Sequence, residues 1–209
     1  MNKRWIKYLV WIVIAGLLAY NSVYIKKTDA NTNAVTTNVD PAQFAQQFWT
    51  NTFTPYMDSA VEINSFVQQL KTDAKKTIAA YSKTQGIGST AYFLIKGEGV
   101  VTAINDDNVV VAVKSGNNTI PVKLNTGIYF GNAVRDVTGK ISMGDFSNTM
   151  DYNTVSATLN KMVQTKIVLP FKAKVVKGAA IQFVGCVEMN TEQINANNIQ
   201  LLPVKIILQ

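Results

Sequence analysis

Hydrophobic and polar residues alternate along several short runs in the second half of the chain. Such alternation is typical of half-buried β-strands, and polar turns such as Asn105–Asn108 separate the runs. One stretch differs, because Val155, Leu159 and Val163 recur at the spacing of one face of a helix. The predicted elements are, in chain order, the strands Ala91–Ile104, Asn108–Lys114 and Thr119–Leu124, the helix Asp151–Thr165, and the strands Ala179–Met189 and Ile199–Leu208.

This order of elements predicts the fold class. Three strands, a helix and two further strands are the elements of the OB-fold, a small Greek-key barrel. We therefore predict an α+β protein whose main part is an OB-like five-stranded barrel with a helix between strands 3 and 4.

Three short helices are predicted before the barrel. Asp40 and Pro41 suit the N-cap and the first position of a helix, which we expect to end at Pro55. Apolar periodicity predicts further helices over Ser59–Leu70 and Asp73–Lys83. Together they form a helical lead-in to the barrel.

The N-terminus carries a long apolar run. Tyr8–Ile25 is interrupted only by Asn21 and Ser22, and it follows the basic segment Met1–Lys7. As a helix, its residues reach about 27 Å, enough to cross the hydrocarbon core of a membrane. The positive-inside rule predicts a single-pass helix with the N-terminus in the cytoplasm and the domain, from Thr28 on, outside it. Cleavage of a signal peptide, which would release a secreted protein, is the alternative.

These patterns divide the chain into four parts. Residues 1–27 are the predicted signal anchor, and residues 28–39 are a linker rich in Asn, Thr and Ala without period. Residues 40–90 form the helical lead-in and residues 91–209 the barrel domain, and we expect 40–209 to be one compact unit.

The positive charge of the chain is concentrated at its N-terminus. The net charge is +7, but five basic residues precede Thr28, and the remainder holds 15 basic and 13 acidic residues. Binding of nucleic acid requires several phosphate contacts from a basic surface. The near-balanced charge of the remainder therefore argues against a nucleic-acid partner.

The sequence lacks the residues of the common catalytic sites. It contains no histidine, which removes the commonest general base and metal ligand. Cys186 is the single cysteine and lies in a strand-like run, so a buried structural thiol is expected. We predict no cofactor, no metal and no enzymatic activity. The alternative is a hydrolase with a carboxylate pair drawn from Glu98, Asp136 and Asp145.

Candidate residues for a ligand or a partner lie in two places. The long segment Gly127–Met150 contains Tyr129, Arg135, Asp136, Asp145 and Phe146, and long loops often carry function. The structural alternative pairs Arg135 with a carboxylate, assigns Asp145 to a turn and packs Phe146 in the core.

The second place is the first barrel strand. Gly97 and Gly99 interrupt it, which indicates a bulge or bend, or a point where a ligand approaches the backbone.

Four short runs resemble one bacterial family. They are Phe93–Val101, Gly131–Asp136, Gly144–Tyr152 and Val184–Val187. They are similar to an uncharacterised family of predicted periplasmic lipoproteins, and the resemblance covers roughly Asp40–Leu208. It implies an extracytoplasmic protein tethered to the cytoplasmic membrane, with its domain in the periplasm, and often encoded beside ribose-type sugar ABC transporters. This chain departs from the pattern because it has no lipid-accepting cysteine near its apolar run.

Two functions from different classes follow. The first is a non-catalytic accessory protein that assists a sugar ABC uptake system through protein contacts, as the resemblance implies. The alternative is a module that binds a carbohydrate or another small ligand, since OB barrels bind oligosaccharides.

Overall fold

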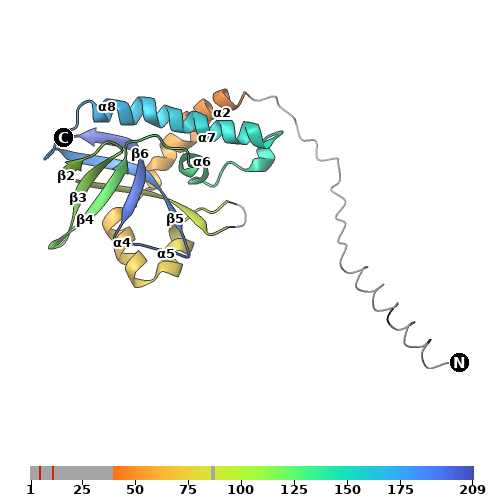
Figure 1. Cartoon of the computed structure of the whole chain (residues 1–209), viewed down its shortest axis with the longest axis horizontal. Coiled ribbons are helices and arrows are strands. Elements are labelled where there is room, and N and C mark those ends of the chain that lie inside the picture. The colour runs from red at the N-terminus through yellow and green to blue at the C-terminus, as the bar shows by residue number, and fades with distance from the viewer. Residues whose placement is uncertain (1–4, 6–10, 12–39, 86–87) are drawn as a thin grey trace. The chain divides into compact units, whose positions relative to one another are not determined.

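A five-stranded barrel occupies the middle of the domain (Figure 1). The computed structural model describes Trp5, Trp11, residues 40–85 and residues 88–209. The strands follow the order β2–β3–β4–β6–β5, and β5 pairs with β2 to close the barrel. Only β4 and β6 run parallel among these five pairings. A two-residue strand, β1, adds to β2 in parallel and makes the sheet six-stranded. The barrel strands are β2 (Thr90–Ile104), β3 (Asn108–Ser115), β4 (Asn118–Asn125), β5 (Ala180–Asn190) and β6 (Ile199–Leu208).

Helices lie on two sides of the barrel. Figure 1 shows α2, α7 and α8 above it and α4 and α5 below it. The elements outside the barrel are α2 (Pro41–Phe48), the π-helical η1 (Trp49–Phe53), α3 (Thr54–Tyr56), η2 (Met57–Ser59), β1 (Val61–Glu62), α4 (Ile63–Thr72), α5 (Ala74–Tyr81), α6 (Ala133–Asp136), η3 (Met143–Asp145), α7 (Thr149–Val163), η4 (Gln164–Val168) and α8 (Leu169–Lys172).

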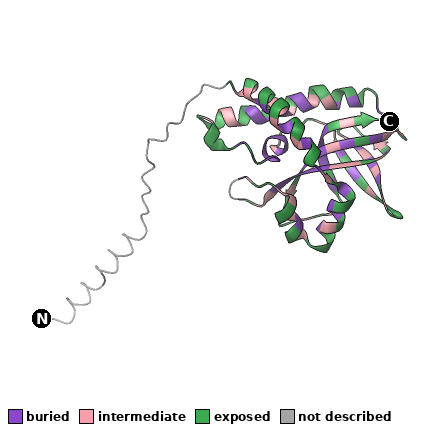
Figure 2. Cartoon of the chain, turned by 180° about the vertical axis from the view of Figure 1, so that it is seen from behind, coloured by how far each residue is buried: buried purple, intermediate pink, exposed green. Residues whose placement is uncertain are grey.

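Two hydrophobic cores form because alternate residues of each strand face opposite sides. In β2, Phe93 and Ile95 belong to the core inside the barrel, which α4 also joins through Phe66. Tyr92 and Leu94 of the same strand belong to a second core, which packs against α2, α6 and α7. Figure 2 shows buried residues alternating along the strands and following one side of the long helices. The fold thus combines a closed barrel with a helical layer on its outer surface.

The predicted α+β class is confirmed, and the barrel strands and the helix between strands 3 and 4 are found as expected. The sixth strand was not predicted. Because Val61–Glu62 pairs with Ile95–Lys96, the helix expected from Ser59 begins only at Ile63. Pro55 does not end the first helix. The helical chain continues through the π-turn η1, and Pro55 then lies in the first turn of α3, where a residue without a main-chain N–H is tolerated.

The predicted membrane segment, Tyr8–Ile25, lies outside the described residues except for Trp11. Contacts between Cα atoms separate a unit Met1–Thr36 from a unit Thr37–Gln209. Within the part of the chain that the structure describes, no helix is both long and apolar enough to span a membrane.

Candidate functional site

Arg135 and Asp136 form a buried ion pair in the short helix α6. Arg135 is 4% and Asp136 1% exposed. Arg135 Nε lies 2.6 Å from Asp136 Oδ1, and Nη2 lies 2.9 Å from Oδ2, so the guanidinium donates to both carboxylate oxygens. Arg135 Nη1 also donates to the main-chain oxygen of Tyr152 at 3.3 Å. The pair therefore satisfies itself inside the fold and presents no charge to solvent.

Aromatic rings cover this ion pair. The Arg135 guanidinium carbon lies 3.6 Å from the ring centroid of Tyr152, a cation–π contact. The Tyr152 ring packs against Phe146 at 5.7 Å, and Phe146 meets Phe44 of α2 edge-on at 5.2 Å. Burial, together with the nearby Asp136 carboxylate, raises the pKa of the Tyr152 phenol. The stack joins the Gly127–Met150 segment to α2 and α7, which is a structural role.

Asp145 is exposed but already bonded. Its Oδ2 accepts from the main-chain nitrogen of Ser142 at 2.7 Å, and the two residues form a reciprocal cap on η3. The structural alternative for Arg135, Asp145 and Phe146 therefore describes their contacts well.

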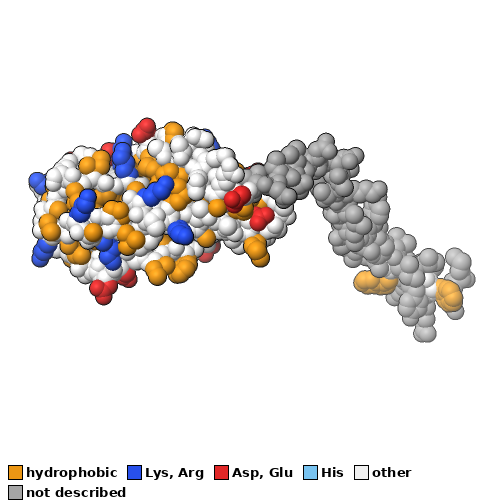
Figure 3. All heavy atoms as spheres, turned by 90° about the horizontal axis from the view of Figure 1, so that it is seen from above, with side chains coloured by type: hydrophobic (Ala, Val, Ile, Leu, Met, Phe, Trp, Pro, Cys, Tyr) orange, Lys and Arg blue, Asp and Glu red, His pale blue; other side chains and the backbone are white. Residues whose placement is uncertain are grey.

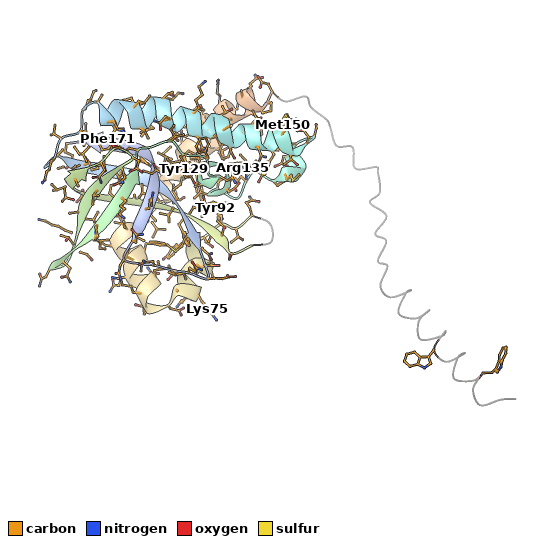
Figure 4. The ribbon with its side chains drawn as sticks, in the orientation of Figure 1. Lys75, Tyr92, Tyr129, Arg135, Met150 and Phe171 are labelled. Carbon is orange, nitrogen blue, oxygen red and sulfur yellow. The ribbon has the colours of Figure 1, made fainter. Side chains whose placement is uncertain are left out.

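Tyr129 is held by a residue that lies far away in the sequence. Its phenol donates to Glu188 Oε2 of β5 at 2.9 Å, beneath α7 in the view of Figure 4. Burial and the Glu188 carboxylate raise the pKa of Tyr129. A hollow of about 360 Å³ lies beside this contact and is also lined by Cys186. Cys186 is 2% exposed and burial raises the pKa of its thiol, as expected of a structural thiol.

The neighbours of Tyr129 are the most exposed aromatic and aliphatic side chains of the segment. Phe130 is 88% and Ile128 77% exposed. The backbone that carries them is fixed, because Gly127 N donates to Asp107 O at 2.9 Å and Asn160 Nδ2 donates to Gly131 O at 2.8 Å. We call Ile128 and Phe130 the apolar tip. The sequence alone does not reveal the apolar tip, because Ile128, Tyr129 and Phe130 are three consecutive large apolar residues and nothing in their order shows which of them are exposed.

Gly97 and Gly99 lie where β2 changes its partner. The strand pairs with β5 as far as Val100 and with β3 from Val100 onward. A Cβ on Gly97 would lie 2.7 Å from Ile63 Cγ2, and one on Gly99 would lie 2.8 Å from Val111 Cγ1 and closer still to the main-chain oxygen of Ala112. Close packing at the bend accounts for both glycines.

A groove of about 950 Å³ opens beside these glycines. Polar side chains of β2, β5 and β6 line it, among them Glu98, Gln182 and Lys205. Gln182 Nε2 donates to Glu98 Oε2 at 3.4 Å, and Phe183, the one aromatic residue of the lining, is 2% exposed. The groove offers hydrogen bonds and charges but no exposed ring on which a sugar could stack. Across residues 40–85 and 88–209 no cluster of three or more metal-binding side chains occurs.

The chain resembles a solved structure in its fold and a known family in its sequence. No curated protein matches the chain. A solved structure, the crystal structure of an OB-fold protein (tm0957) from Thermotoga maritima MSB8, matches with a TM-score of 0.71 and 24% sequence identity. The match covers 81% of this chain and 98% of that chain, and it confirms the predicted OB-fold. A sequence profile described as "Predicted periplasmic lipoprotein (DUF2291)" matches residues 13–207. The chain therefore belongs to this family of predicted periplasmic lipoproteins.

Proposed function

We propose that this protein is a non-catalytic, membrane-tethered docking protein outside the cytoplasm, accessory to a sugar ABC uptake system. The observation that carries the proposal is the apolar tip, where Ile128 and Phe130 are 77% and 88% exposed on a backbone fixed by hydrogen bonds. Exposed aromatic residues on a rigid loop are typical of protein-binding hot spots, because little conformational freedom is lost on association.

The location follows from the family. Its description supports an extracytoplasmic, membrane-associated protein. Attachment of a lipid requires a cysteine, yet Cys186 is the single cysteine of the sequence and is buried in β5. We infer that the apolar run Tyr8–Ile25 supplies the tether, and that residues 28–39 link it to the domain.

The contacts of the carboxylates support binding rather than catalysis. Asp136 is paired with Arg135, and Asp145 caps η3. Glu98 accepts from Gln182 at the groove. A hydrolase of this type needs one carboxyl group that is free to exchange a proton and a second one across the substrate from it. Asp136 and Asp145 are both engaged in structural bonds, so only Glu98 of the three candidates is left for such a pair.

The partner is inferred from the chemistry of the tip and from the resemblance to a family encoded beside ribose-type transporters. Burial of one exposed Phe or Ile side chain in a partner's pocket contributes about 1.5–3 kcal/mol to the free energy of binding. The proposed partner is a permease or sugar-binding protein of such a transporter, with an apolar pocket that accepts both side chains.

The test is co-purification from native membranes in mild detergent after light crosslinking. Ile128→Ser and Phe130→Ser are compared with Met150→Ser, which removes a side chain that is also 77% exposed but lies at the start of α7. We expect the two tip variants to recover at least roughly tenfold less transporter protein, since each loses burial worth about one decade in affinity.

The control variant Met150→Ser should recover as much transporter protein as the parent. Equal recovery with all three variants, or absence of transporter components from the parent sample, would refute the docking function.

The groove supports a second candidate function, binding of a small polar ligand such as a carbohydrate. Its side chains at Glu98, Gln182 and Lys205 can hydrogen-bond several hydroxyl or acidic groups at once. Calorimetric titration of the protein with a sugar panel tests this. Saturable heat that Gln182→Ala and Lys205→Met abolish would support a ligand site, and heat unchanged by both variants would exclude this groove.

A further inference from the structure

The helical layer carries a second surface feature, distinct from the apolar tip. Between Tyr152 and Val187 the sequence contains five lysines and no acidic residue. Lys172 donates to the main-chain oxygen of Asp106, in a turn whose two aspartates are Asp106 and Asp107. The other four, Lys161, Lys166, Lys174 and Lys177, are exposed on α7, η4 and the turn after α8.

Apolar side chains are exposed among these lysines. Leu169 is 52% and Val176 63% exposed. We call these two residues and the four exposed lysines the lysine face. Figure 3, which looks onto α7 and α8, shows lysine and hydrophobic side chains interspersed, whereas acidic side chains lie toward the margins of the view. Within the described residues, none of the four lysines lies within 4.0 Å of a carboxylate.

The opposite side of the domain carries lysines without this apolar component. Lys71, Lys75 and Lys76 are exposed on α4 and α5, next to Asp73, and no large exposed hydrophobic residue occurs on either helix. Figure 4 shows Lys75 at the far side of the barrel from Phe171 of α8. The two sets of lysines therefore provide a matched comparison.

We propose that the lysine face rests on the surface of an anionic phospholipid membrane. Basic side chains attract anionic headgroups, and aliphatic side chains between them enter the interface, as on interfacial helices. The inference rests on the proposed tether, because a tethered domain meets the membrane at high effective concentration and even a weak surface contact then orients it. The contact would turn α7 and α8 to the lipid and leave α4 and α5 facing away.

The test uses the full chain in lipid nanodiscs with a fluorophore on one introduced cysteine. The native Cys186 is buried, so Ala173→Cys beside the lysine face and Ala79→Cys on α5 are labelled selectively. The discs contain a headgroup-quencher lipid in phosphatidylcholine, with or without phosphatidylglycerol. We expect quenching at position 173 only with phosphatidylglycerol, and its loss at about 1 M salt, where the screening length is about 3 Å.

Charge variants identify the lysines responsible. Replacing Lys166, Lys174 and Lys177 by glutamine should lower the equilibrium constant for contact with the membrane roughly a hundredfold, since each lysine raises that constant about fivefold. Replacing Lys71, Lys75 and Lys76 by glutamine should leave the quenching unchanged.

Equal quenching at positions 79 and 173, or quenching independent of phosphatidylglycerol, would overturn the lysine face while leaving the tether intact. Absence of the chain from the disc fraction would overturn the tether, and this inference with it. If the chain is in the disc fraction but position 173 is not quenched in discs that contain phosphatidylglycerol, the lipid contact is overturned and an acidic protein becomes the better partner for the lysines.

Discussion

Arg135 and Asp136 are adjacent in the sequence, a spacing at which side chains on a helix do not normally face each other. They meet here because α6 is only four residues long and Tyr152 covers the guanidinium from α7. A residue type that is common in binding sites is thereby committed to the inside of the fold.

Replacing Arg135 by methionine tests this role. The change leaves the Asp136 carboxylate buried without its partner, so we expect a loss of about 3–5 kcal/mol in the free energy of unfolding. The double variant Arg135→Met, Asp136→Asn should be more stable than the single variant, because no unpaired charge remains. Urea denaturation measures both, and an Arg135→Met variant as stable as the parent would contradict the assignment.

At the scale of elements, β2 depends on glycine at its change of partner. Gly99→Ala would press a methyl group against the backbone of β3, and overpacking of this kind costs about 1–3 kcal/mol. Gly88→Ala is the control, since no atom lies within 4 Å of the added Cβ. Thermal unfolding should therefore show a lower Tm for Gly99→Ala alone. A Tm equal to that of the control would mean that the bend tolerates a side chain.

The elements differ in how far the sequence predicts them. The strands and α7 were predictable because their periodicity is local and reports which side is buried. The π-turn before Pro55 was not, because its wider local bond, from Thr54 N to Trp49 O, leaves no mark in the apolar periodicity. The strand Val61–Glu62 was not either, because it depends on pairing with the distant residues Ile95 and Lys96. The same holds for the candidate site, since the sequence pointed to Tyr129 but could not show that Glu188 holds it and turns Ile128 and Phe130 outward.

At the scale of the whole molecule, several buried acids set the response to alkaline pH. Burial raises the pKa of Cys186, Tyr92 and Tyr129 above their ordinary values of 9.0, 10.0 and 10.0. Above about pH 9 the unfolded chain therefore releases protons that the folded chain retains. The free energy of unfolding should fall as the pH rises from there.

Urea denaturation between pH 7 and pH 11 measures this decline. Tyr129→Phe should make the decline shallower above pH 10, whatever its effect at neutral pH, because the variant has one fewer such proton to release. A slope unaltered by the substitution would show that Tyr129 does not contribute.

The charge of the whole molecule also has a spatial pattern that composition hides. From Thr28 on, the net charge is only +2. The lysine face nevertheless gathers four exposed lysines on one side, while the apolar tip is free of charge. The proposed lipid contact and the proposed partner contact would therefore use different side chains, one set basic and aliphatic and the other uncharged.

Site-specific photo-crosslinking in living cells tests the docking function most directly. A photoreactive phenylalanine analogue replaces Phe130 in one strain and Met150 in another, and mass spectrometry identifies the products. The account predicts a crosslink from position 130 to a permease or binding protein of a sugar ABC transporter, and none from position 150. The same products from both positions, or no transporter component from position 130, would contradict it.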